Sequence, residues 1–201
     1  MPKIKKNELP GLDAQLLLAP EFRKKSLKNS FDLSSAKKAG VLILCYPDSH
    51  GVIHFVLILR KAYKGVHSAQ VAFPGGKLED QDKNLTETAI RETEEEIGVN
   101  SNRINVIRPM TELYIPPSNF LVKPTLASID YTPEFVKEDA EVDKIIQVNF
   151  NEFLDTPITK DKITTSYTGE RDVMCYKLNG YTVWGATAMM LSELQVVFNK
   201  L

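Results

Sequence analysis

Glutamates that could hold a metal ion gather on one short segment of the chain. Residues 91–99 read RETEEEIGV. A helix through them would place Glu92, Glu95 and Glu96 on one face, because positions three and four apart are neighbours on a helix. Like charges at this spacing destabilise a helix by about 0.2–0.5 kcal/mol per pair. A hard cation such as Mg²⁺ or Mn²⁺ would offset that repulsion, since it prefers carboxylate oxygens, and it could then bind phosphate oxygens and activate water.

The alternative is that these glutamates form an ordinary solvated helix face. A turn, FPGG at residues 73–76, precedes them. Gly75 and Gly76 permit a close approach of the backbone that a side chain would block. Arg91 can pair with an acid in the connecting loop. Together, the glycine turn, the loop and the acidic helix favour a metal site that binds phosphates.

The elements around these residues follow from periodicity. Residues 84–97 carry a moderately apolar stripe that includes Ile90, Thr93 and Ile97, and Gly98 follows as a helix stop. This pattern predicts a helix over 84–97 whose acidic face lies opposite the stripe.

Strands are predicted before and after this helix. Residues 40–46 and 52–59 flank a turn-forming cluster, PDSHG, and predict a hairpin. Both runs are nearly continuous in apolar residues, so we expect both faces of their sheet to be covered. The remaining predictions are strands within 104–115, 119–130 and 144–150, a helical turn at 151–155, a hairpin from 162–168 and 172–178, and a final helix over 185–200.

This alternation predicts an α/β/α sandwich, with a mixed β-sheet between helices. We expect residues 1–38 to form an N-terminal extension with one short helix lying over the surface, and residues 39–201 to form the catalytic domain.

Composition restricts the function classes. The chain has 201 residues and a formal net charge of -1, so nothing favours a nucleic-acid surface. Its longest apolar runs are far below the roughly 20 residues of a membrane helix, and its N-terminus does not resemble a secretory signal. Cys45 and Cys175 lie in apolar strand-like contexts, which favours buried free thiols in a reducing compartment over a disulfide or a metal site. We therefore expect a cytoplasmic protein with no membrane or nucleic-acid partner.

The segment from Gly76 to Val99 resembles the Nudix hydrolase signature, G-x5-E-x7-R-E-U-x-E-E-x-G-U, where U is bulky and aliphatic. The matching positions are Gly76, Arg91, Glu92, Glu95, Glu96, Gly98 and Val99. Asp82 replaces the loop glutamate, with one extra residue before Arg91, and Thr93 replaces an aliphatic residue. The insertion lies in the loop, so the question it raises is whether Asp82 still pairs with Arg91.

The resemblance implies the Nudix sandwich fold and hydrolysis of a nucleoside diphosphate linked to another group, with Mg²⁺ or Mn²⁺ as cofactor. It implies metal ligands at Glu92, Glu95, Glu96 and the Gly76 carbonyl. Glu92 and Glu95, together with Arg91, would be the catalytic residues, with Glu92 or another carboxylate deprotonating water.

A second resemblance extends beyond this signature. Residues 57–77 resemble the segment that precedes it in Nudix coenzyme A diphosphatases, where Arg60 and the FPGG turn match with the spacing kept. The resemblance implies substrate binding by Arg60, Phe73 and Lys77. Departures from that motif occur at Lys61, Gly65 and Ala69, where it has Ser, Arg and Gly.

Three further side chains carry open alternatives. Tyr114 could contact substrate or pack a loop. Glu141 resembles the acid that many Nudix enzymes carry before a late strand, and is either a supplementary metal ligand or base, or a solvated acid. His67 could be catalytic or a surface residue.

The sequence thus predicts a pyrophosphohydrolase of small phosphoanhydrides, with coenzyme A or its derivatives as substrate. The alternatives are hydrolysis of ADP-ribose, dinucleotides or nucleoside triphosphates, and a ligand-sensing Nudix domain without activity. A homodimer is left open.

Overall fold

The computed structural model describes residues 8–19, 24, 33–62, 69–165 and 169–199. A mixed sheet of eight strands forms its centre, in the order β3-β2-β1-β7-β5, with β4 also paired to β1, β6 to β7 and β8 to β2. Strands β1 and β7 run parallel, whereas the other neighbouring strands described in this sheet are antiparallel. The strands are β1 (Lys37–Pro47), β2 (Ile53–Arg60), β3 (Val71–Ala72), β4 (Gly75–Lys77), β5 (Asn105–Pro109), β6 (Leu113–Ile115), β7 (Phe120–Ser128) and β8 (Val142–Asn149).

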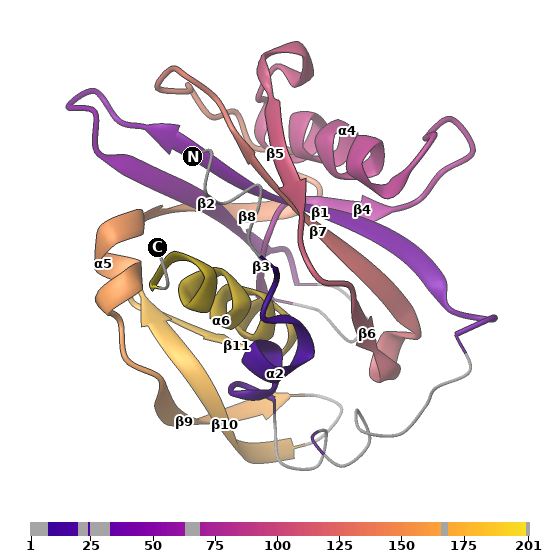
Figure 1. The fold of residues 1–201 in the computed structure, drawn as a ribbon, viewed down its shortest axis with the longest axis vertical. Coiled ribbons are helices and arrows are strands. Elements are labelled where there is room, and N and C mark those ends of the chain that lie inside the picture. Colours follow the sequence, from indigo (N-terminus) through magenta and orange to yellow (C-terminus); the bar gives the residue numbers. More distant parts are fainter. Residues whose placement is uncertain (1–7, 20–23, 25–32, 63–68, 166–168, 200–201) are drawn as a thin grey trace.

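Helices cover both faces of this sheet, as the apolar strands predict. Helix α4 (Leu85–Ile97) lies on one face, and α6 (Gly185–Asn199) lies on the other (Figure 1). Along β1 the buried side chains alternate, so that Leu42 and Leu44 pack in the core with α4 while Ile43 packs in the core with α6. The predicted α/β sandwich is therefore confirmed.

Helix α4 is defined by a cap at each end. The Asn84 side chain accepts hydrogen bonds from the amides of Thr86 and Glu87, which satisfies donors that a helix start leaves free. Gly98 ends the helix in the left-handed conformation at φ 73°, where a glycine has no steric penalty. A Cβ on Gly40 of β1 would lie 2.0 Å from the Leu85 carbonyl oxygen, so a glycine there lets α4 pack closely on the sheet.

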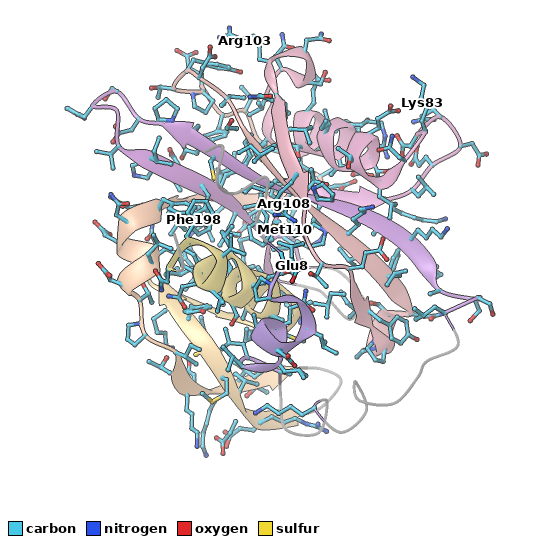
Figure 2. All side chains as sticks on the ribbon, in the orientation of Figure 1. Glu8, Lys83, Arg103, Arg108, Met110 and Phe198 are labelled. Atoms are coloured by element: carbon cyan, nitrogen blue, oxygen red, sulfur yellow. The ribbon has the colours of Figure 1, made fainter. Side chains whose placement is uncertain are left out.

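Helix α6 lies between the large sheet and a second sheet of three strands (Figure 1). The second sheet contains β9 (Thr159–Thr165), β10 (Gly169–Leu178) and β11 (Tyr181–Trp184). Helix α5 (Phe150–Asp155) packs against α6 and against β2 and β8 of the large sheet. Phe198, near the end of α6 (Figure 2), contacts Phe150 at 4.6 Å between ring centroids. Burial on several sides explains why α6 is apolar on more than one face.

The N-terminal segment differs from the expectation of a surface helix. Helix α2 (Gly11–Leu16) packs on α6, and Leu18 and Ala19 behind it are fully buried. The Ser192 hydroxyl donates to the Ala14 carbonyl at 2.7 Å, and Gln15 donates to the Glu193 carboxylate at 3.1 Å. This segment is thus part of the core beside α6.

The other sequence expectations have mixed outcomes. Strands β5 to β8 and helix α5 lie where the patterns predict them, and two short 3₁₀ turns, η1 (Ser101–Arg103) and η2 (Pro116–Ser118), add to them. The predicted hairpin of 162–168 and 172–178 corresponds to β9 and β10, but both strands begin earlier than predicted, and residues 166–168 lie outside the described residues. Cys45 and Cys175 are buried free thiols, as predicted. Across the described residues, the helices are too short or too polar to cross a membrane.

Candidate active site

The glycine turn and the acidic helix meet above strand β1. Strand β4 pairs with β1 through Gly40 and Gly76, and it carries the turn beneath α4. A Cβ on Gly76 would lie 2.3 Å from the Glu92 carboxylate carbon, and one on Gly75 would lie 2.3 Å from the Gly40 carbonyl oxygen. Gly75 is therefore required for the turn to fit against the β1 backbone, whereas Gly76 leaves room for the Glu92 carboxylate.

Glu96 is the most deeply buried carboxylate of the helix, at 2% exposure. The Gly75 amide donates to its Oε2 at 2.8 Å, and Arg60 Nη1 lies 3.5 Å from its Oε1. Burial raises the pKa of Glu96 to about 7, although the Gly75 amide and the Arg60 charge act in the opposite direction. Glu96 is thus a carboxylate whose negative charge is only partly compensated.

Glu92 and Glu141 add negative charge to the same region. Burial raises the pKa of Glu92, and the charges of Glu95 and Glu141 act in the same direction. The charges of Glu92 and Glu141 likewise raise the pKa of Glu96. The Glu141 backbone is joined to the end of β2, because its carbonyl accepts a hydrogen bond at 2.8 Å from the amide of Lys61, directly after Arg60. Glu92 and Glu96 thus lie at the glycine turn, and the charge of Glu141 acts on both.

Arg91 links the helix to the connecting loop. Its Nε and Nη2 donate to the two oxygens of Asp82, at 3.0 and 3.1 Å, so the loop acid pairs with Arg91 despite the insertion. It also donates to Glu92 at 3.1 Å and to Glu95 at 2.8 Å. The hydrogen bond from Arg91 lowers the pKa of Asp82 to about 2, which keeps this acid ionised. The question raised by the insertion is thereby answered.

The donor set fits a hard divalent cation in its chemistry. Glu92, Glu96 and Glu141 offer carboxylate oxygens, and a cation beside them would relieve the charge that burial leaves uncompensated. Among the described residues, however, no three His, Cys, Asp or Glu side chains already form a metal cage. Glu95 is 57% exposed and is held by Arg91. Metal binding at these residues thus requires side chains to rearrange around Gly76.

The three residues assigned to the substrate by resemblance, and Tyr114 as a further candidate, have different surroundings. Arg60 lies at the site and pairs with Glu96. Lys77 has an exposed side chain at the end of β4, while its carbonyl accepts from Arg91. Tyr114 lies on β6, where its hydroxyl donates to Asn119 at 2.9 Å. Phe73 is 1% exposed in the core, so its ring offers no surface to a substrate, and its role is to anchor the turn.

Sequence reasoning missed two groups of the site. One is the Gly75 amide, which donates to Glu96. The other is Thr88, fully buried on α4, whose hydroxyl donates to Asp82 at 3.0 Å. A polar residue on the buried side of a helix is the signal that could have identified Thr88. Gly65 and His67 lie outside the described residues.

Comparison with known proteins places this geometry in a family. A model of the NUDIX domain matches residues 36–166. The peroxisomal coenzyme A diphosphatase ndx-8 of Caenorhabditis elegans is 33% identical over 178 residues, which are 84% of this chain and 74% of that protein. The Nudix hydrolase NudL of Photorhabdus laumondii is 30% identical over 90% of this chain and 91% of its own length.

Solved structures agree on the fold. The Nudix hydrolase RenU of M. smegmatis superposes with a TM-score of 0.56 at 15% identity, covering 83% of this chain and 88% of RenU. The MutT protein of Methanosarcina mazei superposes with a TM-score of 0.53 at 14% identity, over 83% of this chain and 99% of its own. With the family model spanning most of the chain and the acidic helix packed over its glycine turn, this protein belongs to the Nudix hydrolases.

Proposed function

We propose that this Nudix hydrolase cleaves the diphosphate of coenzyme A or its derivatives with Mg²⁺ or Mn²⁺ as cofactor. The observation that carries the hydrolytic part is the position of Glu92 and Glu96 beside the Gly75–Gly76 turn, where the charge of Glu141 acts on both. Nudix hydrolases generally use divalent metal ions, and a bound ion would neutralise phosphate charge and lower the pKa of the attacking water.

The side chains have distinct roles in this proposal. Glu92, Glu96, the exposed Glu95 and the Gly76 carbonyl would hold the ion, with Glu141 as a supplementary ligand. Arg91 would orient Glu92 and Glu95, since it donates to both.

The reaction is the displacement of one phosphate from another by water. The water oxygen forms a bond to phosphorus while the bridging phosphorus–oxygen bond breaks. A carboxylate beside the turn takes the proton of the water. Glu92 is suited to this step because burial raises its pKa, which increases its affinity for a proton relative to an exposed glutamate.

The choice of coenzyme A rests on similarity. The 33% identical relative is a coenzyme A diphosphatase, and Arg60 with the FPGG turn matches the motif of that subfamily. Lys77 directly follows the glycine turn, and its side chain is exposed at the end of β4, so it could contact a phosphate of the substrate. Tyr114 would have to release Asn119 to stack on a substrate ring.

Product analysis tests this proposal. With coenzyme A we expect 4′-phosphopantetheine and 3′,5′-ADP in the presence of Mg²⁺ or Mn²⁺, and neither product in chelator. ADP-ribose, a dinucleotide and a nucleoside triphosphate are assayed in parallel, and Glu92→Gln serves as the inactive control. Efficient cleavage of ADP-ribose to AMP and ribose 5-phosphate, with coenzyme A intact, would leave the Nudix chemistry standing and refute the substrate.

A further inference from the structure

Asp82 is the acid that fixes Arg91, and it is held by more than Arg91 alone. Its side chain is 4% exposed. One oxygen, Oδ2, accepts hydrogen bonds from Arg91 Nη2 at 3.1 Å, from the Glu79 amide at 3.0 Å and from the Thr88 hydroxyl at 3.0 Å. An oxygen with three donors at these distances has a defined position, so Asp82 can present both oxygens to the planar guanidinium of Arg91.

The Thr88 hydroxyl is the contact that comes from the helix itself. Thr88 is fully buried, and its hydroxyl lies 3.3 Å from the Asn84 carbonyl oxygen and 3.0 Å from Asp82. A helical threonine commonly returns its hydrogen to the carbonyl four residues earlier. Here the carboxylate is the nearer and the charged acceptor, so the bond to Asp82 is the stronger of the two.

From this geometry we infer that Thr88 is a positioning residue for the hydrolytic reaction. Its hydroxyl fixes Asp82, Asp82 fixes Arg91, and Arg91 holds Glu92 and Glu95. Without the hydroxyl, Asp82 keeps fewer restraints, and Arg91 is freer to turn toward the glutamates that would hold the ion. The inference rests on the proposed function, because Glu92 and Glu95 act in the reaction only if that proposal is right.

Thr93 provides a matched control on the same helix. It is also fully buried, and its hydroxyl donates to the Ala89 carbonyl at 2.6 Å. Thr93→Val and Thr88→Val each remove one buried hydroxyl from α4 and replace it with a methyl group of similar size. They differ in that Thr88 bonds a carboxylate of the Asp82–Arg91 pair, whereas Thr93 bonds the helix backbone.

The experiment compares Thr88→Val, Thr88→Ala, Thr88→Ser and Thr93→Val with the wild type. The substrate is whichever phosphoanhydride of the panel the wild type cleaves fastest. For Thr88→Val and Thr88→Ala we expect kcat to fall about tenfold, as the loss of about 1.4 kcal/mol would give. We expect KM to change less than about twofold, since Thr88 is buried away from substrate. Thr88→Ser, which keeps the hydroxyl, should retain most of the wild-type kcat, and Thr93→Val should match the wild type.

Calorimetric titration with Mn²⁺ gives a readout independent of turnover. In Thr88→Val the dissociation constant of Mn²⁺ should rise severalfold relative to Thr93→Val, because Arg91 competes for Glu92 and Glu95. Equal kcat and equal Mn²⁺ affinity in the two valine variants would overturn the inference, even if Thr88→Val melts at a lower temperature. It would also be overturned if neither Thr88→Val nor Thr88→Ala folds while Thr93→Val does. If the wild type cleaves no substrate, the proposed function is refuted. The Mn²⁺ affinities of Thr88→Val and Thr93→Val still test the positioning role of Thr88.

Discussion

Replacing Glu96 with glutamine should make the metal-free protein more stable at neutral pH. Glu96 is 2% exposed, and burial raises its pKa from an ordinary value of 4.5 to about 7. The difference corresponds to about 3 kcal/mol in favour of the protonated form in the folded state. Glutamine has the same shape without the charge, and its amide oxygen can still accept the hydrogen bond from Gly75.

The sign of the pH dependence follows from linkage. The pKa of Glu96 is higher in the folded protein than in the unfolded chain. Protonation of Glu96 therefore stabilises the fold fully below about pH 4.5, and this stabilisation is lost as pH rises through about 7. Relative to Glu96→Gln, the wild type should therefore lose about 3 kcal/mol of unfolding free energy across this window. In a chain of this size, that corresponds to about 6–12 °C in melting temperature.

The assay is thermal unfolding of both proteins in chelator, at a series of pH values between about 4.5 and 8. The difference in unfolding free energy between the two proteins at each pH isolates the contribution of Glu96, because the other titrating groups contribute to both. At the alkaline end, saturating Mg²⁺ should raise the melting temperature of the wild type more than that of Glu96→Gln. The variant should also lose activity by orders of magnitude. Parallel pH–stability curves for the two proteins would refute the reasoning about the buried charge.

Three other changes have defined outcomes. Gly76→Ala should fold, because its Cβ would meet only the movable end of the Glu92 side chain, at 2.3 Å. Its kcat should fall by about 100-fold, because the Glu92 carboxylate is displaced. A wild-type kcat would contradict this role of Gly76. Ala69 has φ 53°, a backbone conformation that costs a non-glycine residue about 1–2 kcal/mol. After the greater chain entropy of glycine in the unfolded state is subtracted, Ala69→Gly should raise the melting temperature by about 2 °C. A lower melting temperature would show that Ala69 is not strained. At limiting Mg²⁺, activity should rise between about pH 6 and 8, because the raised pKa values of Glu92 and Glu96 make protons compete with the metal; a flat profile would contradict it.

The sequence predicted the parts of the fold that depend on local pattern. Helix α4 spans Leu85–Ile97, close to the predicted 84–97, because periodicity and a glycine stop are local signals; the cap at Asn84 was not predicted. The β1–β2 hairpin follows from two apolar runs around a turn. The glycine at position 76 was predicted as a point of close approach, and the structure shows what approaches it, the Glu92 carboxylate.

What the sequence did not predict depends on contacts between distant segments. The docking of α2 on α6 joins Gln15 to Glu193, and no local pattern indicates that pair. Phe73 was assigned to the substrate because it belongs to a motif, but a motif does not state which way a ring points, and this ring lies in the core against Phe55. The pairing of Arg60 with Glu96 was likewise not predicted, and the assignment of Arg60 to the substrate stays a prediction.

The repulsion between the helix glutamates is resolved differently from the way their spacing suggested. Glu94 accepts a hydrogen bond from the Ser101 amide, and Arg91 neutralises both Glu92 and Glu95. Repulsion along the helix surface therefore does not by itself require a cation, since side chains and backbone already offset most of it. The largest charge left without full compensation is that of Glu96, because burial outweighs its contacts with Gly75 and Arg60, and burial also raises the pKa of Glu92 despite Arg91. The stronger physical reason for a cation at this site is thus the buried carboxylate beneath the glycine turn, and the crowding of acids on α4 is secondary to it.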